Sequence, residues 1–226
     1  MVREELQRTA KLLGENAVER LSGVKIAVFG LGGVGGHAAE ALVRTGVGAL
    51  DIIDGDTVAL SNLNRQLVAL HSTVGRLKTD VCEKRFLDIN SELKLRKFPL
   101  FFGEETAGQF DFTEYDYVLD CIDDVSAKVL LAETCARENV RIISSMGAGN
   151  KLNPMGFRVA DIYETSVCPL ARVMRQRLRK AGVERLRVVY STEEPVITER
   201  TPASCAYVPS AAGLLMAATV IDELTR

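Results

Sequence analysis

Short apolar runs alternate with segments of helical composition through residues 22–150. Runs of this length are typical of strands that are buried on both faces of a parallel sheet. We expect such strands at residues 26–29, 49–53, 93–98, 117–120 and 141–145, and helices at 37–44, 78–89 and 125–138. Strands and helices in this alternation predict an α/β fold with a doubly wound, mostly parallel sheet.

Both ends of the chain are predicted to be helical. Residues 2–21 have the apolar periodicity of an N-terminal helix, and the segment 208–224 has a proline at a helix start and is apolar on several faces. Its longest apolar run, 211–221, is interrupted by Gly213 and Thr219. We therefore expect a buried C-terminal helix and no membrane span. Such a helix needs cover from the sheet and from a second surface, which a homodimer interface would supply.

The segment before the C-terminal helix differs in character. Residues 157–162 are predicted to form an outer strand, and residues 190–200 an extended, mobile connection in which Pro195 excludes a regular interior strand. Between them, residues 172–187 contain a single acid, Glu184. The cations of this stretch are Arg172, Arg175, Arg177, Arg179, Lys180, Arg185 and Arg187. One interpretation is a solvated helix face, but charge of one sign concentrated in this way favours a polyanionic partner.

A glycine-rich turn joins the first expected strand to the helix that follows it. Gly30, Gly32, Gly33 and Gly35 form the pattern G-x-G-G-x-G. Glycines let the backbone approach a phosphate closely, and the N-terminus of a helix favours anions. The pattern predicts a nucleotide-phosphate site, while a tight turn without a ligand is the alternative.

Polar residues after the second strand complete the predicted nucleotide site. Asp54 lies about 20 residues beyond the glycines, where a dinucleotide fold holds a ribose hydroxyl pair. Amides and the cation Arg65 follow in the stretch 61–66, and Lys78 comes next. Cations beyond a ribose site suit a triphosphate better than a nicotinamide, because the triphosphate charge has to be neutralised.

Composition places few limits on the protein. The 226 residues include 47% apolar and 26% charged residues, with a formal net charge of −2, which excludes a uniformly basic nucleic-acid coat. Arg3, Glu4 and Glu5 have no apolar core behind them, so we expect no signal peptide and a cytoplasmic protein. Five scattered cysteines without a C-x-x-C pair indicate neither a zinc ribbon nor a redox pair.

Five motifs follow one another along the chain: Gly30-x-Gly32-Gly33-x-Gly35, Asp54-x-Asp56, Ser61-Asn62-Leu63-x-Arg65-Gln66, Val74-Gly75-x-x-Lys78 and Leu119-Asp120-Cys121-Ile122-Asp123-Asp124. In this order they resemble the adenylating enzymes related to ubiquitin-activating enzymes and to the bacterial activators of sulfur-carrier proteins. The resemblance extends over nearly the whole chain. It implies a Rossmann-like ATP-binding domain that uses ATP and Mg²⁺.

The resemblance also implies roles for individual residues. The nucleotide-binding residues would be Gly30, Gly32, Gly33, Gly35, Asp54, Asp56, Asn62, Arg65, Gln66 and Lys78. Asp123 would bind the Mg²⁺ that bridges the ATP phosphates, although one of Asp123 and Asp124 is also expected to cap the following helix. Catalysis would depend on Arg65, Lys78, Asp123 and Arg8. Arg8 would reach the ATP phosphates of the partner subunit in a homodimer, since an arginine neutralises charge that develops during adenylyl transfer.

Within that family the chain is most similar to the tRNA threonylcarbamoyladenosine dehydratases. The similarity is carried by Arg8-Thr9-x-x-Leu12-Leu13-Gly14, Arg44-Thr45-Gly46-Val47-Gly48, Asp161-Ile162-Tyr163-x-Thr165, Pro169-Leu170-Ala171, Tyr190-Ser191-Thr192-Glu193 and Pro202-Ala203-Ser204-Cys205. It implies ATP-dependent cyclisation of a threonine-derived carboxylate on a modified adenosine beside the tRNA anticodon. The tRNA would contact Arg172, Arg175, Arg177, Arg179 and Lys180.

Two other functions are compatible with the motifs. One is adenylation of the C-terminus of a ubiquitin-like sulfur carrier, in which Cys168 would receive the carrier as a thioester. Many dehydratase-like members have an acid at this position, whereas many carrier activators have two C-x-x-C pairs that this chain lacks. The other is a nucleotide-binding scaffold for a sulfur-transfer partner, which would not need Arg65, Lys78 and Asp123 together.

We expect these parts to form a single domain over residues 1–226, although the length alone also allows two small domains. Its expected parts are the N-terminal helix 1–21, the nucleotide-binding core 22–150, the outer strand and basic segment 151–200, and the C-terminal helix 201–226.

Overall fold

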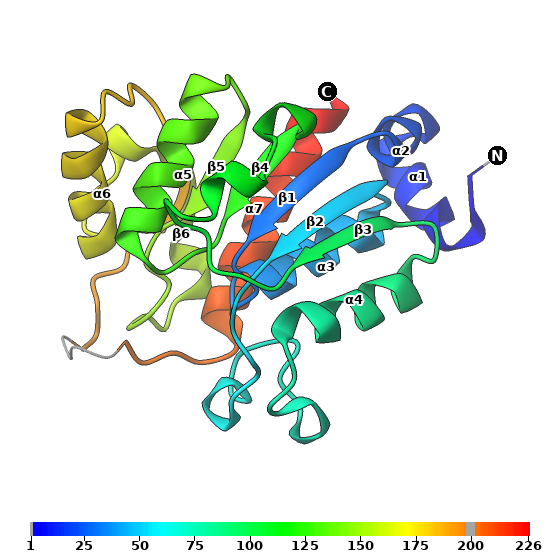
Figure 1. Cartoon of the computed structure of the whole chain (residues 1–226), viewed down its shortest axis with the longest axis horizontal. Coiled ribbons are helices and arrows are strands. Elements are labelled where there is room, and N and C mark those ends of the chain that lie inside the picture. Colours follow the sequence, from blue (N-terminus) through cyan, green and yellow to red (C-terminus); the bar gives the residue numbers. More distant parts are fainter. Residues whose placement is uncertain (1, 198–201) are drawn as a thin grey trace.

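The computed structural model describes residues 2–197 and 202–226, in which seven strands form one sheet (Figure 1). The strand order is β3-β2-β1-β4-β5-β7-β6, and every neighbouring pair is parallel except β6 and β7. The strands are β1 Lys25–Phe29, β2 Ala49–Ile53, β3 Lys94–Phe98, β4 Tyr117–Asp120, β5 Ile142–Ser145, β6 Phe157–Asp161 and β7 Arg187–Ser191. The predicted α/β fold with a doubly wound, mostly parallel sheet is confirmed.

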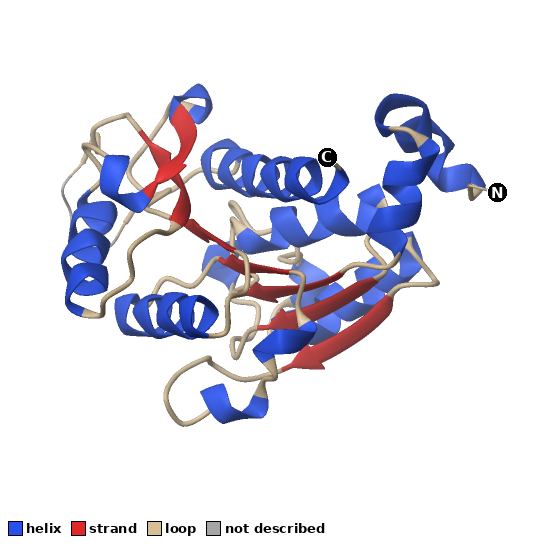
Figure 2. Ribbon diagram, turned by 90° about the horizontal axis from the view of Figure 1, so that it is seen from above, coloured by secondary structure: helices blue, strands red, loops and turns tan. Residues whose placement is uncertain are grey.

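Helices cover both faces of this sheet (Figure 2). The α-helices are α1 Gln7–Leu13, α2 Glu15–Ser22, α3 Gly35–Thr45, α4 Lys78–Ile89, α5 Val125–Arg137, α6 Pro169–Lys180 and α7 Tyr207–Thr225. Short 3-10 turns are η1 Glu4–Leu6, η2 Leu60–Asn62, η3 His71–Thr73, η4 Ala107–Gln109, η5 Phe112–Glu114, η6 Pro154–Gly156 and η7 Ile162–Glu164.

Side chains of the central strand β1 alternate between two separate cores. Ile26 and Val28 pack into the core formed with α3, α4 and α7, whereas Ala27 and Phe29 pack into a core with α5 and several phenylalanines. All four side chains are fully buried. A strand buried on both faces has no polar positions to alternate with, which explains the continuous apolar run in its sequence.

The C-terminal helix α7 packs along α3 and across the sheet. Its length and apolar composition would also allow it to cross a membrane. In the structure Val208, Ala212, Met216 and Val220 are buried in the same core as α3. The prediction of a buried C-terminal helix with proline at its start is therefore confirmed.

The N-terminal region differs from the prediction of one helix over residues 2–21. It is divided at Gly14, which ends α1 and precedes α2. Gly14 has φ +92°, a conformation that L-residues with a side chain rarely adopt. The break turns α2 so that Ala17, Val18 and Leu21 are buried while α1 projects at the edge of the molecule (Figure 1).

The connection predicted for residues 190–200 is wrong at its start. Tyr190 and Ser191 end strand β7, which lies inside the sheet between β5 and β6. Pro195 follows the strand and leaves its hydrogen bonds intact. The prediction of an outer strand at 157–162 is confirmed, because β6 occupies the sheet edge. The end of the predicted connection, from residue 198, lies outside the described residues.

The order of the strands locates a crevice at one edge of the sheet. β1 lies between β2 and β4, and the chain leaves β1 for α3 on one face but leaves β4 for α5 on the other. At such a switch point the two connections diverge, and α/β proteins bind ligands there, outside the carboxyl ends of the strands. The glycine-rich turn follows β1 and the motif with Asp123 follows β4, so both sequence motifs meet at this crevice.

Candidate functional site: a nucleotide crevice at the carboxyl ends of the strands

The glycine loop is packed tightly against the ends of two strands. The N–H of Gly30 donates to the carbonyl of Ile53 over 2.8 Å. Gly30 has φ +91°, and a β-carbon built on it would lie 2.6 Å from the carbonyl oxygen of Cys121. On Gly35 a β-carbon would lie 1.8 Å from the carbonyl oxygen of Gly30. Neither position can hold a side chain, so these two glycines are required by the turn itself.

The loop leads into the N-terminus of α3 with its donors free. Within residues 2–197 and 202–226, the N–H groups of Gly32 and Gly33 have no hydrogen-bond acceptor. The α3 helix spans 11 residues, so its dipole adds partial positive charge at this end. Free N–H groups at a helix N-terminus form an anion site that suits a phosphate.

Asp54 connects the glycine loop to the second strand. One of its carboxylate oxygens accepts the N–H of Leu31 over 2.7 Å, and the other accepts the N–H of Asp56 over 2.8 Å. Burial raises the pKa of the Asp54 carboxyl, while the Lys78 ammonium opposes that rise. One oxygen of Asp54 thus faces the glycine loop and the other faces its own segment, so the carboxylate is fixed between the ends of β1 and β2.

Lys78 begins α4 as predicted and is almost fully buried. Its ammonium lies 2.7 Å from the carboxylate of Asp56 and 3.7 Å from that of Asp54. A lysine in the first turn of a helix is disfavoured by the helix dipole, and the two carboxylates compensate for that cost here. Asp56 is half exposed, so the ammonium can exchange this partner for a phosphate.

The stretch 61–66 folds back over the glycine loop. The Arg65 side chain lies 3.5 Å from a β-carbon built on Gly33, and the Gln66 amide nitrogen lies 3.9 Å from one built on Gly32. Gln66 is buried, and its side-chain oxygen has no partner among the described residues. Buried polar atoms are normally hydrogen-bonded, so this oxygen is available to a ligand donor.

Asn62 and Arg65 also make local contacts. Asn62 accepts the N–H of Ala59 over 3.0 Å and thereby caps the short turn η2. The Arg65 guanidinium donates to the carbonyl of Ser61 over 3.0 Å and to Asn64 over 2.9 Å. These bonds fix the loop while leaving further guanidinium donors of Arg65 for an anion.

The helix cap predicted for one of Asp123 and Asp124 is confirmed at Asp124. Asp124 caps α5, because its carboxylate accepts the N–H of Ala127 over 2.8 Å. Asp123 is exposed, and its carboxylate makes no hydrogen bond or ion pair to the residues that the structure describes. In that part of the chain no cluster of three His, Cys, Asp or Glu side chains could hold a metal. A single carboxylate fits Mg²⁺ that is bound mainly through substrate phosphates.

Sequence reasoning missed the buried polar network behind this loop. Asp120 and Lys128 form an ion pair of 2.9 Å with both side chains 0% exposed. The Ser144 hydroxyl donates to the same carboxylate. Because Asp120 and Lys128 are eight residues apart in sequence, and on different elements, their pairing has no local sequence signal.

Arg8 lies at the opposite end of the sheet from the glycine loop. Arg8 is exposed on α1, and α1 packs on α2. The end of α2 lies at the start of β2, because the N–H of Gly48 donates to the carbonyl of Leu21 over 3.0 Å. Figure 1 shows α1 and α2 beside the amino ends of β1 and β2. Arg8 therefore cannot reach the crevice of its own chain.

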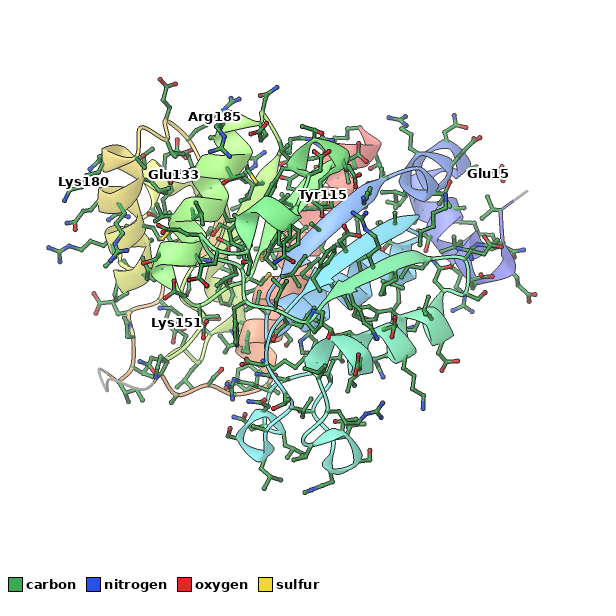
Figure 3. All side chains as sticks on the ribbon, viewed as in Figure 1. Glu15, Tyr115, Glu133, Lys151, Lys180 and Arg185 are labelled. Atoms are coloured by element: carbon green, nitrogen blue, oxygen red, sulfur yellow. The ribbon has the colours of Figure 1, made fainter. Side chains whose placement is uncertain are left out.

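The predicted tRNA-binding residues lie on or beside one helix, α6, at the far side of the molecule from α1 (Figure 1). Arg175 donates to the backbone and hydroxyl of Thr165, Arg177 donates to Ser126 over 3.0 Å, and Arg179 stacks over Tyr163. Arg172 and Lys180 are exposed, and Figure 3 shows Lys180 on the outer side of the helix. Buried Ala171, Met174 and Leu178 hold the opposite face of α6 on the protein.

The cysteines are free thiols in largely apolar surroundings. Cys82, Cys135 and Cys168 are buried. Burial raises the pKa of the Cys82 and Cys135 thiols, and it raises the pKa of Cys121 to about 12. Cys168 is 2% exposed and lies just before α6 in a core with Met146 and Ile162. A buried thiol is poorly placed to accept a protein carrier.

A hollow of about 730 Å³ lies at the other edge of the sheet. Its charged lining is already paired, as Arg187 contacts Glu223 over 2.5 Å and Arg226 contacts Asp222 over 2.7 Å. The hollow therefore lacks the unpaired donors of the glycine crevice, which remains the candidate site.

Nearly the whole chain is similar to a known protein family. A sequence profile of the ThiF family matches residues 5–226. The chain belongs to the ThiF family. This match confirms the family resemblance inferred from the five motifs. The predicted similarity to the tRNA threonylcarbamoyladenosine dehydratases is also confirmed, because proteins of that name align with nearly the full chain.

Two similar proteins align over nearly the full length of this ThiF-family chain. The tRNA threonylcarbamoyladenosine dehydratase of Bacillus subtilis is 39% identical, in an alignment that covers 98% of this chain and 95% of that protein. The crystal structure of the E. coli tRNA N6-threonylcarbamoyladenosine dehydratase in complex with ATP has a TM-score of 0.92 and 33% identity, covering 98% of this chain and 94% of that one.

A third relative represents the alternative function. The adenylyltransferase and sulfurtransferase UBA4 of Candida glabrata is 33% identical over 132 residues, which is 58% of this chain and 30% of that protein. The similarity to this protein therefore stops short of the full chain, whereas the two dehydratases above match 98% of it.

Proposed function

We propose that this protein is an ATP-dependent tRNA threonylcarbamoyladenosine dehydratase. The observation that carries the proposal is the similarity to proteins of that name over nearly the full chain. The same chain has the glycine loop, Asp54, Arg65, Lys78 and Asp123 at one crevice. A structural neighbour with ATP bound supports ATP as the nucleotide here. Conversion of ATP to AMP that depends on tRNA tests the proposal, and NAD in place of ATP should support no reaction.

The chemistry explains why ATP is needed. A carboxylate is a poor acceptor for nucleophiles because its leaving group would be oxide. Transfer of AMP from ATP to the carboxylate releases pyrophosphate and gives an acyl-adenylate, whose leaving group is AMP. A nitrogen of the same threonylcarbamoyl group then attacks the activated carbonyl, closes a ring and releases AMP. The net change in the nucleoside is loss of water, and no protein nucleophile takes part because the attack is intramolecular.

In this proposal each site residue acts through position and charge. The Gly32 and Gly33 N–H groups bind phosphate oxygens, and Asp54 accepts the ribose hydroxyls. Lys78 moves from Asp56 to the phosphates, and Arg65 adds a second cation, so both neutralise charge that grows on the α-phosphate. Asp123 would hold Mg²⁺ together with phosphate oxygens, and this ion would supply Lewis-acid neutralisation of the triphosphate.

We further propose that the protein acts as a homodimer in the cytoplasm. Arg8 is too far from its own crevice to touch a nucleotide there, and it lies on a helix that exposes apolar side chains. Leu12 is 85% exposed on this helix, and Leu214 is 51% exposed on α7. Burying such side chains against a second copy would be favourable and would bring Arg8 into the partner's crevice. A sulfur-transfer partner protein stays a secondary proposal.

Cys168→Ala should separate the dehydratase from a carrier activator. Because ring closure needs no protein thiol, we expect AMP formation with tRNA within about twofold of the native rate. The small cavity should cost roughly 1 kcal/mol of folding free energy, seen as a thermal midpoint lower by a few degrees. Loss of all activity in a folded variant would favour thioester transfer instead.

The exposed face of α6 should supply phosphate contacts. Replacing Arg172 and Arg179 together by glutamine should raise the tRNA dissociation constant about fivefold, since each exposed ion pair contributes roughly 0.5 kcal/mol. The steepness of the salt dependence should fall, because fewer counterions are released. Filter binding at several salt concentrations measures both.

The matched control for this change removes two charges from the opposite side of the molecule. Lys84 on α4 and Lys94 on β3 are exposed, and their replacement by glutamine should leave tRNA binding nearly unchanged. Equal effects of the two double variants would show that net charge, and not the α6 surface, attracts tRNA.

A further inference from the structure

A buried ion pair lies directly behind the loop that carries Asp123. Asp120 is the last residue of β4, and Lys128 lies in the first turns of α5. Their side chains are 0% exposed, and the ammonium is 2.9 Å from the carboxylate. Ser144 of β5 donates a further hydrogen bond to this carboxylate. The charges thus bind three neighbouring elements together beneath the crevice.

The pair holds one residue of the loop, Ile122, at both of its backbone polar groups. The Asp120 carboxylate accepts the N–H of Ile122 over 3.2 Å, and the Lys128 ammonium donates to the carbonyl of Ile122 over 3.1 Å. Ile122 immediately precedes Asp123. With its two polar groups fixed in this way, the backbone that carries Asp123 has little freedom to shift.

The same segment forms a wall of the glycine loop. A β-carbon on Gly30 would lie 2.6 Å from the carbonyl oxygen of Cys121, and one on Gly35 would lie 3.0 Å from the Cys121 side chain. The peptide held by the ion pair therefore touches the turn that would bind phosphate. A displacement of this segment would alter the distance between the phosphate site and Asp123.

Stability alone does not explain the ion pair. Removing two charges from water costs several kcal/mol per ion, and well-packed apolar residues of similar volume are often as stabilising as a buried pair. The two hydrogen bonds to Ile122 instead resemble the outer hydrogen bonds that orient metal ligands, whose loss typically weakens metal binding 10- to 100-fold.

We propose that Asp120 and Lys128 are positioning residues, which set the place of Asp123 so that its carboxylate and the nucleotide phosphates can share one Mg²⁺ ion. This inference rests on the proposed function, because it deepens the role given there to Asp123. Mg²⁺ requires near-ideal octahedral geometry, so small displacements of one oxygen ligand weaken its binding. Lys128 also neutralises Asp120, which leaves Asp123 as the anionic group that faces the cation.

The test compares Mg²⁺ dependence with stability in a double variant. Asp120→Asn with Lys128→Met removes both charges and keeps similar volumes. We measure binding of a fluorescent ATP analogue by the full chain, without tRNA, as Mg²⁺ is titrated. The Mg²⁺ concentration at half-maximal effect should rise about tenfold, while analogue binding without Mg²⁺ and the thermal midpoint stay close to those of the native protein.

A second buried carboxylate supplies the matched control. Asp51 is fully buried and forms an ion pair with Arg96 of 2.6 Å at a distance from the loop. Asp51→Asn with Arg96→Met should shift the thermal midpoint without changing the Mg²⁺ dependence. Were the first variant unable to fold, Ser144→Ala would take its place, with a smaller shift in the same direction. An unchanged Mg²⁺ dependence in the folded variant, or an equal change in the control, would overturn the inference.

The binding experiment keeps this inference separate from the proposed function. A native protein that binds the nucleotide with Mg²⁺ but makes no altered tRNA would contradict the dehydratase and leave the positioning role standing. A double variant with native Mg²⁺ dependence would contradict the positioning role alone. A native protein whose nucleotide binding is indifferent to Mg²⁺ would contradict the positioning role and the Mg²⁺ role of Asp123, and the tRNA product would still decide the dehydratase.

Discussion

Replacing Asp123 with asparagine should lower tRNA-dependent AMP formation by at least about a hundredfold and leave the fold intact. The substitution removes an anionic oxygen that would hold Mg²⁺ at the triphosphate, so charge developing in the transition state loses its counter-charge. Asp123 is exposed and unbonded to described residues, so its loss should change the folding free energy by no more than about 0.5 kcal/mol. Initial rates with saturating ATP, together with a thermal melt, measure the two effects.

The neighbouring aspartate is the matched control for this prediction. Asp124→Asn removes the same charge from the adjacent position, but asparagine caps a helix about as well as aspartate does. Its capping bond to Ala127 should persist, and the rate should stay within about twofold of the native value. If the two variants lost activity equally, the net negative charge of the loop would explain the loss, and a specific role of the Asp123 carboxylate would be excluded.

Mixing two inactive variants should restore activity if the crevice is completed by a second copy. Arg8→Ala and Asp123→Asn are each expected to be inactive as pure dimers. In a mixed dimer the crevice of the Arg8→Ala chain keeps its own Asp123 and receives Arg8 from the other chain. Random exchange of subunits should then restore about a quarter of the native activity, because half of the dimers are mixed and each has one complete crevice.

The control for the mixing experiment uses two changes in the same crevice. Lys78→Met and Asp123→Asn both belong to the nucleotide side of the site, so no mixed dimer of these variants has a complete crevice. That mixture should stay inactive. If sedimentation shows dimers but the Arg8→Ala and Asp123→Asn mixture also stays inactive, the role of Arg8 across the interface is contradicted.

The sequence predicted the parts of this fold that carry a local signal. The buried parallel strands are continuous apolar runs, and the glycine pattern has a steric cause in the close approach of Gly30 to Cys121. The start of α4 at Lys78 was also predicted correctly. Each of these features is decided by residues that are near one another in the chain.

Features that depend on distant partners were not predictable in this way. Strand β7 lies inside the sheet, yet Arg187 and Tyr190 within it follow a basic helix and precede a proline, which obscured the strand. The Asp120–Lys128 pair is made by the packing of α5 on β4, and a lysine in a helix more often indicates a solvated face. The position of Arg8 relative to the crevice likewise follows from the whole fold, not from its motif.

The tRNA product itself gives the most direct measurement of the proposed activity. The protein is incubated with ATP, Mg²⁺ and total tRNA that contains threonylcarbamoyladenosine, and the masses of the digested nucleosides are measured by mass spectrometry. We expect the threonylcarbamoyladenosine signal to be replaced by one lighter by a single water, with one AMP formed for each nucleoside converted. An unchanged nucleoside, in a preparation that binds ATP and is correctly folded, would contradict the proposed function.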